Sequence, residues 1–521
     1  MNPKIILLHP PVSKPSEPPA GIAKLAGCLQ LNNIDHEVID MNLEGLLHLL
    51  TNPASENYGS DRWTLRAGKH REKNLAALRD GKIYDNESRY QRVVADINRL
   101  VSQAGKAYGV DLSLADYHDA QLTAVKSGDL LRAAENPQGN PFYPYFSSRL
   151  ENVLQEEPEF LGFSLNYLSQ ALCTFAMIGF VRRRNPRQKI ILGGSLTTSW
   201  LKIAGNKDIF RGLVDELVAG AGERRLLELL HCPDGQLDEP PAYDDFPIGD
   251  YLAPAAILPY GTAQGCYWHQ CSFCPEKAED NPYLPQPANA LLAQLQELSS
   301  RMHPGLIHLL DNALSPALLH VLSQSDLGVP WYGFTRFTSH LANEEFCRAL
   351  RRSGCVMLKL GVESGDQSVL DSLHKGIDLK IVSRALKAIR QAGIATYIYL
   401  LFGTPPENEE SARKTLAFTV EHAEFIDFLN LAIFNLPALS PEVQTLATTG
   451  FYEGDLSLYQ DFVHPLGWQR NEVRKFLEKT FKRHPAINEI RQHNPKYFTS
   501  NHAPFFHKAS VPCAAHEINF R

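Results

Sequence analysis

The sequence predicts an α/β protein built from a Rossmann-like, doubly wound parallel sheet with a helical insertion, followed by a partial (β/α)6 barrel of the TIM type. Two observations support this fold class. Short apolar runs alternate with segments of helical periodicity at 5–230 and again at 256–434, and such alternation implies parallel strands. A stretch rich in Asp, Pro and Glu at 236–250 separates the two series, as a linker would.

These patterns divide the chain into a first domain at 1–235, a linker at 236–250, a barrel at 251–440 and a mostly helical or irregular extension at 441–521. In the first domain, strands are expected at 5–8, 36–39, 160–164, 189–192 and 213–218, with helices at 20–31, 170–183 and after 223. Four helix-like stretches (43–50, 73–79, 90–104 and 119–134) lie within a segment of about 44–145. A structureless loop of that length is improbable, so we expect a helical insertion that covers the sheet edge or a ligand.

Ligands of doubly wound sheets bind beyond the carboxyl ends of the strands. Glycines stand at two of those ends, at Gly193-Gly194 and at Gly220 with Gly222. Turns and helix caps are the commoner use of any one glycine, but together they suggest a groove where the backbone approaches a ligand. The first strand is not followed by G-x-G-x-x-G, so a dinucleotide site is not expected.

Six strand–helix units are expected in the barrel, with strands at 256–258, 306–310, 331–335, 356–360, 395–402 and 428–434. Chemistry in such barrels collects at the carboxyl ends of the strands. Here those ends carry a cysteine loop, Asp311, Arg336, Glu363 and the turn Gly403-Thr404-Pro405-Pro406. Charged or metal-binding residues at most ends of one rim favour a functional site over packing. The extension shows one clear helix, at 471–483.

The cysteine loop contains Cys266, Cys271 and Cys274 in a C-x4-C-x2-C pattern. Such short spacings let one loop fold its thiolates around a single soft metal centre. Three thiolates are one ligand short of a closed tetrahedral site, so an iron–sulfur cluster held by them keeps one iron free to bind another molecule. A closed zinc site is the alternative, with His269 or a distant histidine as the fourth ligand.

Composition narrows the functional class. The 521 residues carry a net charge of −7 and a pI near 6.3, which argues against a protein that coats nucleic acid. We find no apolar run of about 18 residues, so no membrane span is expected. The chain opens directly as a strand, without a signal-peptide layout. Three clustered cysteines among nine do not form a disulfide framework, so a reducing, cytoplasmic location is expected.

The barrel resembles that of cobalamin-dependent radical S-adenosylmethionine (SAM) enzymes. Gly361-Val362-Glu363-Ser364-Gly365 resembles the motif after the fourth strand of that family, Leu309-Leu310-Asp311-Asn312 the end of its second strand, and Phe402-Gly403-Thr404-Pro405-Pro406-Glu407 that of its fifth. The resemblance implies that the three cysteines hold a [4Fe–4S] cluster whose open iron binds SAM. It also implies reductive cleavage of SAM to a 5′-deoxyadenosyl radical. The expected SAM-binding residues are Phe273, Asp311, Arg336, Glu363, Ser364, Phe402 and Leu436.

This chain departs from the family pattern in two ways. The family's usual cysteine spacing is C-x3-C-x2-C, so the first spacer here has one extra residue, which a bulge in the loop can absorb. The first domain also lacks the D-x-H-x-x-G motif whose histidine ligates cobalt in methyl-carrier domains, and has His9-Pro10-Pro11-Val12-Ser13 after its first strand. Cobalamin is therefore expected without an axial histidine from that motif. The residues expected to line it are Ser13, Ser164, Asn166, Tyr167, Gly193, Gly194, Ser195, Thr197, Gly220 and Glu223.

Three functions are compatible with these features. The first is a radical methyltransferase that moves a methyl group from methylcobalamin to an unactivated carbon or a phosphinate of a small-molecule or peptide substrate. The second is a cobalamin-dependent radical cyclisation or rearrangement without methyl transfer, and the third is a non-catalytic sensor that binds metal and cobalamin. The two enzymes need an external electron donor such as flavodoxin or ferredoxin. We expect Arg336 and Glu363 to contact SAM, and the alternative is that they pair with each other across the barrel mouth.

Overall fold

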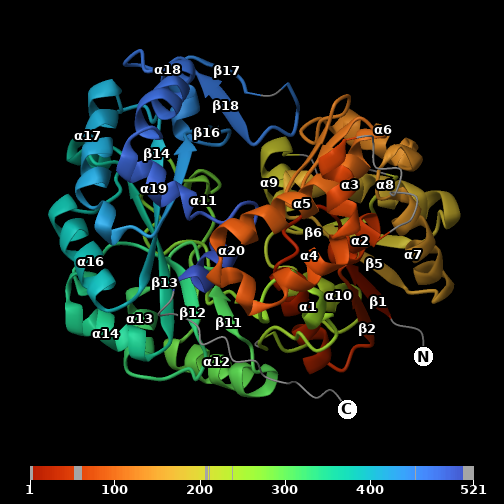
Figure 1. Ribbon diagram of the computed structural model, residues 1–521. Coiled ribbons are helices and arrows are strands. Elements are labelled where there is room, and N and C mark those ends of the chain that lie inside the picture. The colour runs from red at the N-terminus through yellow and green to blue at the C-terminus, as the bar shows by residue number, and fades with distance from the viewer. Residues whose placement is uncertain are drawn as a thin grey trace. The chain divides into compact units, whose positions relative to one another are not determined.

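The computed structural model describes residues 4–51, 61–205, 209–210, 212–237, 239–451 and 453–507 (Figure 1). They divide into two compact units. The first contains Met1–Leu75, Val93–Leu252 and Leu436–Phe462, and the second contains Ala76–Arg92, Ala253–Asn435 and Val463–Arg521. Among the described helices, none has the length and apolarity needed to span a membrane.

A five-stranded parallel sheet forms the centre of the first unit, with strand order β2-β1-β5-β6-β7. Its strands are β1 (Ile5–Leu8), β2 (His36–Ile39), β5 (Phe160–Ser164), β6 (Lys189–Gly193) and β7 (Glu216–Leu217). β1 pairs with β2 on one side and with β5 on the other, so the strand order reverses between β1 and β5. The doubly wound prediction is confirmed, and this reversal is where such sheets bind ligands.

The last strand of this sheet is shorter than the sequence suggested. The apolar run at 213–218 predicted a full strand, but β7 pairs with β6 only at Ile191↔Glu216 and Leu192↔Leu217. The start of the run is used differently, because the carbonyl of Leu213 accepts a hydrogen bond from Arg182 Nε at 2.9 Å. Backbone hydrogen bonds to β6 begin only at Asp215, whose N–H donates to the carbonyl of Ile190 at 3.0 Å.

Helices α1 (Ala20–Leu31), α8 (Leu168–Arg184), α9 (Ser195–Ala204) and α10 (Glu223–Leu229) connect or follow these strands. α8 is buried along its whole middle, from Gln170 to Val181, because α6 and α7 pack against it. The polar stretch at 236–250 also packs on this unit. Tyr243 in that stretch is fully buried, and Ala242 N donates to the carbonyl of Ala23 in α1 at 2.9 Å.

The insertion is mainly helical, as predicted, with α2 (Met41–Thr51), α3 (Arg62–Lys69), α4 (Arg71–Leu78), α5 (Glu87–Lys106), α6 (Ser127–Glu135) and α7 (Tyr143–Gln155). The helix expected at 119–134 is wrong in its first half. β3 (Val110–Leu112) and β4 (Tyr117–Asp119) form an antiparallel hairpin that ends at Asp119, and α6 begins only at Ser127. The carboxylate of Asp119 accepts from the backbone N–H groups of Gln121 and Leu122 at 2.7 and 2.9 Å, which closes a turn in place of a helix.

The second unit contains a six-stranded parallel sheet whose strands follow chain order, with β8 and β15 at its two edges. They are β8 (Ile257–Tyr260), β11 (Leu306–Leu309), β12 (Trp331–Thr335), β13 (Cys355–Glu363), β14 (Ala395–Phe402) and β15 (Phe428–Ile433). Figure 1 shows α12 (Ala288–Met302), α13 (Pro316–Ser323), α14 (Glu344–Arg352), α16 (Leu379–Gln391) and α17 (Glu409–Glu421) along the outer side of these strands. The predicted partial barrel is confirmed.

The inner face of this sheet packs on the C-terminal extension. Tyr332, Met357 and Tyr397 belong to a buried cluster that includes Ala503, with Phe505 and Phe506 against it. The extension contains α18 (Arg470–Phe476), a π-helical turn (Leu477–Phe481), α19 (Pro485–Gln492) and α20 (Thr499–His502). The sequence did not predict the small antiparallel sheet formed by β16 (Leu436–Pro437), β17 (Thr448–Gly450) and β18 (Tyr459–Phe462).

Candidate functional site

The cysteine loop begins directly after β8, and Asp311 fixes its start. Asp311 follows β11, and its carboxylate accepts from Thr262 N at 3.1 Å and from Thr262 Oγ1 at 2.6 Å. Burial raises the pKa of Asp311, while the hydrogen bonds from Thr262 act in the opposite direction. In this structure the carboxylate therefore supports the loop that carries the cysteines.

Four consecutive residues, 373–376, hold the cysteine loop from another side, and we call them the bracing loop. The carbonyl of Leu373 accepts from Ser272 N, and that of His374 accepts from Trp268 Nε1, both at 3.0 Å. Gly376 has a φ of 66°, and a Cβ there would lie 2.1 Å from the Trp268 ring. The indole therefore needs a glycine beside it.

The three thiols interact with one another electrostatically. Burial raises the pKa of Cys274 to about 11, and the Cys271 and Cys266 thiols add to this rise. Burial also raises the pKa of Cys271, whereas the charges of Lys375 and Arg336 lower it. Because the thiolate is the form that binds a metal, a metal ion bound by these cysteines must displace their protons.

The donor set fits an iron–sulfur cluster in its chemistry, but the thiols are not gathered in advance. Within the described ranges, no group of three or more His, Cys, Asp or Glu side chains is close enough to hold a metal ion. His269, the alternative zinc ligand, has its Nε2 3.8 Å from Asp280 Oδ1. His269 Nδ1 is buried without a hydrogen-bond partner among the described residues. Neither the three thiols nor the set that adds His269 is assembled there, so this geometry favours neither metal over the other.

Arg336 and Glu363 are both buried at the rim, with 5% and 7% of their surfaces exposed. Arg336 Nη1 lies 3.7 Å from Cys271 Sγ, and its guanidinium carbon lies 4.3 Å from the centroid of the Trp268 ring. A second guanidinium nitrogen donates to the carbonyl of Lys375 in the bracing loop. The arginine thus joins the end of β12 to the cysteine loop.

The ion pair of Glu363 is with Lys375, whose Nζ lies 2.7 Å from Glu363 Oε1. Both side chains are buried, so the pair is little screened by solvent. The alternative in which Glu363 and Arg336 pair with each other is not what the described residues show. Sequence reasoning missed Lys375, because it lies in a short loop between two helices and no local pattern marks it.

Two further predicted SAM residues lie near this pair. Phe273 is half-buried, and Lys375 Nζ lies 5.6 Å from the centroid of its ring. Ser364 is buried, and its Oγ lies 3.2 Å from Thr415 Oγ1 in α17. The first is therefore at the cysteine loop, whereas the hydroxyl of the second is engaged with the helix layer.

The remaining two lie elsewhere. The Phe402 side chain is fully buried, and its ring packs edge-on against Phe481 at a centroid distance of 5.1 Å. Its backbone carbonyl accepts from Phe434 N at 2.8 Å, so assignment of Phe402 to the SAM site stays a prediction. Leu436 is buried in β16, which belongs to the first compact unit. Assignment of Leu436 to the SAM site stays a prediction.

The predicted cobalamin residues at the ends of β5 and β6 form one network. Asn166 Nδ2 donates to Ser164 Oγ at 3.0 Å, and Asn166 Oδ1 accepts from Ser195 N at 3.1 Å. Gln170, which sequence reasoning missed, accepts from Asn166 N at 2.9 Å and donates to the carbonyl of Pro10 at 2.7 Å. A buried glutamine thus joins the loop after β5 to the loop after β1, at the reversal of the sheet.

Ser13 lies in the loop after β1 and is tied to its neighbours. Its N–H donates to Asn42 Oδ1 at 2.8 Å, and its hydroxyl lies 2.9 Å from His9 Nε2. His9 is buried, and burial lowers its pKa. The other ring nitrogen of His9 lies 3.5 Å from Gln170 Nε2, so the imidazole is held inside the domain by its own neighbours.

Gly194 has a structural role that differs from the one expected. Its φ is 109°, and a Cβ there would lie 2.3 Å from the carbonyl oxygen of Leu165. The close approach that requires glycine is therefore to this chain's own backbone. A Cβ at Gly193 would meet only Val218, at 3.7 Å, and the Gly193 carbonyl accepts from Thr197 Oγ1 at 3.2 Å.

The last three predicted cobalamin residues are more open. Tyr167 is 57% exposed. Gly220 has a φ of 70°, open space around its Cα, and an N–H that donates to Thr198 Oγ1 at 2.9 Å. Glu223 lies in the first turn of α10. These positions leave their surfaces available to a ligand at the strand ends.

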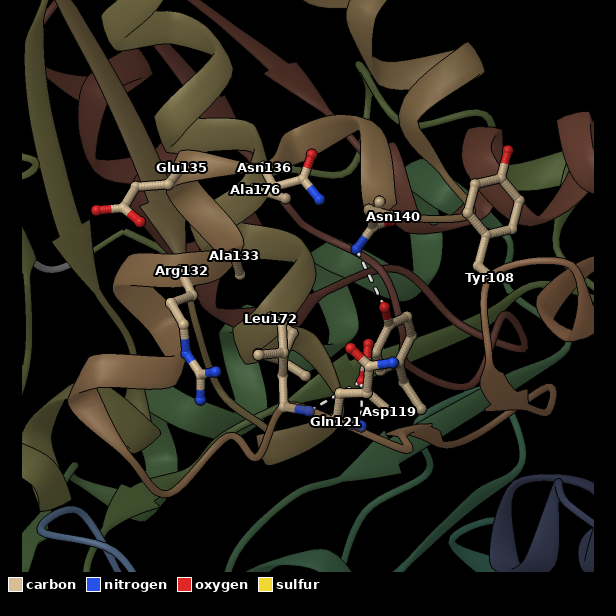
Figure 2. Close-up of a pocket in the computed structure, with 13 residues that line it drawn as sticks. Tyr108, Asp119, Gln121, Arg132, Ala133, Glu135, Asn136, Asn140, Leu172 and Ala176 are labelled. Atoms are coloured by element: carbon tan, nitrogen blue, oxygen red, sulfur yellow. Dashed lines mark hydrogen bonds between the residues drawn. The ribbon is translucent and has the colours of Figure 1, made fainter.

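A separate pocket of about 490 Å³ lies in the insertion. Figure 2 shows its wall, which is built by the β3–β4 hairpin, α6, the segment 136–140 and α8. Asn140 Nδ2 donates to Tyr117 Oη at 3.3 Å across this wall. Asp119, on the same wall, is occupied by the backbone turn described above. None of the predicted SAM or cobalamin residues lines this pocket.

Comparison with known proteins supports part of these assignments. Residues 260–419 match the family described as the radical SAM superfamily. An uncharacterized methyltransferase of Pyrococcus horikoshii is 23% identical over 244 residues, which are 42% of this chain and 52% of that protein. The anaerobic magnesium-protoporphyrin IX monomethyl ester cyclase of Rubrivivax gelatinosus is 24% identical over 246 residues, or 39% and 44%. The matched regions thus span about half the length of these relatives.

A solved structure is similar over most of the chain. The radical S-adenosylmethionine methyltransferase TsrM from Kitasatospora setae, described with cobalamin and a [4Fe–4S] cluster bound, covers 85% of this chain and 78% of its own. The TM-score is 0.51 at 14% sequence identity. The TM-score and the coverage show that the two proteins share a fold over most of this chain, and at this low identity they show the fold alone.

Proposed function

We propose that this chain, whose residues 260–419 form a radical SAM domain, is a cobalamin-dependent radical SAM methyltransferase. The observation that carries the proposal is the three-cysteine loop at the rim of a parallel partial barrel, with a buried carboxylate and two buried cations beside it. The methyltransferase named among the relatives and the fold shared with a cobalamin-binding methyltransferase support it. A bound [4Fe–4S] cluster would supply the electron that cleaves SAM, and bound methylcobalamin the methyl group.

Arg336 and Glu363 are the residues we assign to SAM. A guanidinium can meet the SAM carboxylate with two parallel hydrogen bonds, and a carboxylate can accept from the ribose hydroxyls or the amino group. Losing one charged hydrogen bond typically costs about 1.5–3 kcal/mol, which is roughly ten- to hundredfold in affinity. We expect Glu363→Gln and Arg336→Lys each to weaken SAM binding by this factor while iron is retained. Normal SAM cleavage in both variants, with only product formation lost, would assign the pair to the substrate.

The thiol assignment is tested by iron content after anaerobic reconstitution. We expect about four irons in the wild type, with broad absorption near 400 nm from thiolate-ligated iron, and loss of both in Cys266→Ser, Cys271→Ser and Cys274→Ser. Cys173→Ser and Cys347→Ser are matched controls, because both thiols are buried away from the loop. One zinc and no iron in the wild type would overturn the radical proposal.

Cobalamin is proposed to bind at the ends of β1, β5 and β6, in the first unit. His9 is held by Ser13 and Gln170, which supports cobalt without an axial nitrogen from this histidine. Electron paramagnetic resonance of the cob(II)alamin state is therefore expected to lack the three-line splitting of a nitrogen ligand. The appearance of that splitting in the wild type, and its loss in His9→Ala, would contradict this assignment.

Radical cyclisation is the second candidate, because the relative from Rubrivivax gelatinosus is named as a cyclase. Product analysis separates the candidates. A methylase produces both S-adenosylhomocysteine and 5′-deoxyadenosine, a cyclase only the second, and a non-catalytic sensor neither. We further propose a small-molecule or peptide substrate, reduction by flavodoxin or ferredoxin in the cytoplasm, and no nucleic-acid partner.

A further inference from the structure

Two cations converge on one of the three cysteines. Arg336 Nη1 lies 3.7 Å from Cys271 Sγ. Lys375 Nζ lies 5.6 Å from the centroid of the Phe273 ring in the same loop, and its charge lowers the pKa of Cys271. Cys274 has different surroundings, because its thiol meets the backbone N–H groups of Glu276 and Lys277 at the start of α11 (Pro275–Ala278). The charge around the loop is therefore concentrated on the Cys271 side.

Lys375 contributes to this arrangement through two separate groups. Its carbonyl accepts from Arg336, and its ammonium pairs with Glu363 at 2.7 Å. The backbone of Lys375 thus positions one charge at the rim, and its side chain positions another. A substitution of the side chain removes its charge and leaves the contact with Arg336 in place.

We propose that Arg336 and Lys375 are positioning residues that raise the reduction potential of the cluster from its Cys271 side, with Glu363 offsetting part of their charge. The inference rests on the proposed function and deepens it. Reduction adds one electron to the cluster, so nearby positive charge stabilises the reduced form. Hydrogen bonds to the sulfurs, net charge and solvent exposure are what set such potentials. Both cations are about 5% exposed or less, so solvent screens them little.

This proposal predicts the sign of three changes. Lys375→Met and Arg336→Met each remove a positive charge and should make reduction at least tenfold less favourable, or 59 mV for a one-electron couple. Glu363→Gln removes a negative charge and should shift the potential upward. The double variant Lys375→Met with Glu363→Gln leaves the net charge unchanged and should return close to the wild type. Lys375→Arg keeps the positive charge, so it should change the reduction potential of the cluster less than Lys375→Met does.

The experiment is an anaerobic redox titration of the reconstituted protein without SAM, followed by electron paramagnetic resonance of the reduced cluster. Lys277→Met is the matched control, because Lys277 donates to the carbonyl of Gln270 in the same loop at 2.9 Å but is only half-buried. We expect Lys277→Met to change the equilibrium constant for reduction of the cluster less than threefold. Iron is measured in every variant.

The outcomes separate this inference from the proposed function. A wild type without a four-iron cluster overturns the function itself. A loaded Lys375→Met with an unchanged potential overturns the inference alone. Shifts of the same sign in Lys375→Met and Glu363→Gln would indicate a structural role and not a charge effect. If Lys375→Met does not load iron, the iron content of the double variant Lys375→Met with Glu363→Gln distinguishes the two roles. A purely structural role of the pair predicts that the double variant loads even less iron than Lys375→Met, whereas a charge effect predicts that loading is restored.

Discussion

Glu407 provides a sharp test of the structure, because it is a fully buried carboxyl group. It ends the turn after β14, and its Oε2 accepts from Gly403 N and, at 3.1 Å, from Trp468 Nε1. Its other oxygen, Oε1, is buried without a hydrogen-bond partner among the described residues. Burial raises the pKa of Glu407 from 4.5 to about 7, although the two hydrogen bonds act in the opposite direction.

A raised pKa makes stability fall as pH rises. Between the ordinary value and the value of about 7, the folded protein binds more protons at this site than the unfolded chain, so the free energy of unfolding decreases with pH. A shift of this size corresponds to about 3 kcal/mol. We therefore expect Glu407→Gln, which keeps a carbonyl acceptor for Gly403 and Trp468, to match the wild type near pH 5. At pH 8 the variant should be more stable by up to about 3 kcal/mol.

The assay is urea unfolding of the protein without cluster or cobalamin, followed by tryptophan fluorescence at several values between pH 5 and pH 8. At each pH, the difference in the free energy of unfolding between the wild type and the variant isolates the contribution of Glu407 from those of the other titrating groups. Glu409→Gln is the control, since Glu409 is exposed and pairs with Arg413 on the surface of α17. A Glu407→Gln difference that does not change with pH would refute the burial that we assign to this carboxylate.

Two further predictions concern other positions. Gly193→Val should lower cobalamin occupancy and leave the fold intact, because a Cβ there meets only Val218, whereas Gly194→Ala should destabilise the protein with or without cobalamin. Gly128→Ala in α6, where a Cβ meets nothing within 4 Å, is the control, and equal cobalamin occupancy in all three variants would refute the assignment. Asp311→Ala removes the acceptor of Thr262 and should lower the free energy of unfolding by about 1–3 kcal/mol, measured by urea unfolding. The same variant should also retain less iron, measured by metal analysis.

Most of the fold could be predicted because its signals are local. The strand predicted at 395–402 is β14 to the residue, since eight consecutive β-favouring or apolar residues end at a glycine. The rim was predictable for the same reason, because polar side chains interrupt apolar runs where the strands end. Local signals also led to one error, because the segment at 119–134 contains helix formers but Asp119 closes a turn. The close approach of Gly194 to the Leu165 backbone was not visible in the sequence, and its place in the cobalamin site stays a prediction.

The bracing loop could not be predicted, because its contacts join residues far apart in sequence. Lys375 meets Arg336 across 39 positions, and Trp268 meets His374 across 106. A lysine followed by glycine between two helices is an ordinary loop by itself. Nothing local distinguishes it from the half-buried Lys277 in α11, directly after the cysteine loop. Lys375 reaches Glu363, 12 positions earlier, because the chain returns to the end of β13 after the short helix α15 (Gln367–Ser372).

The bracing loop also explains how the cysteine loop accommodates its extra residue. The spacer between Cys266 and Cys271 contains Trp268 and His269, and His269 takes a left-handed φ of 46°, which is uncommon for a residue other than glycine. Trp268 is fixed on one side by the carbonyl of His374 and on the other by the guanidinium of Arg336 at 4.3 Å. Because Ser272 is also bound to the bracing loop, both sides of Cys271 are anchored to the same four residues. The additional residue can then bulge outward while Cys271 stays beside the cations that we propose tune the cluster.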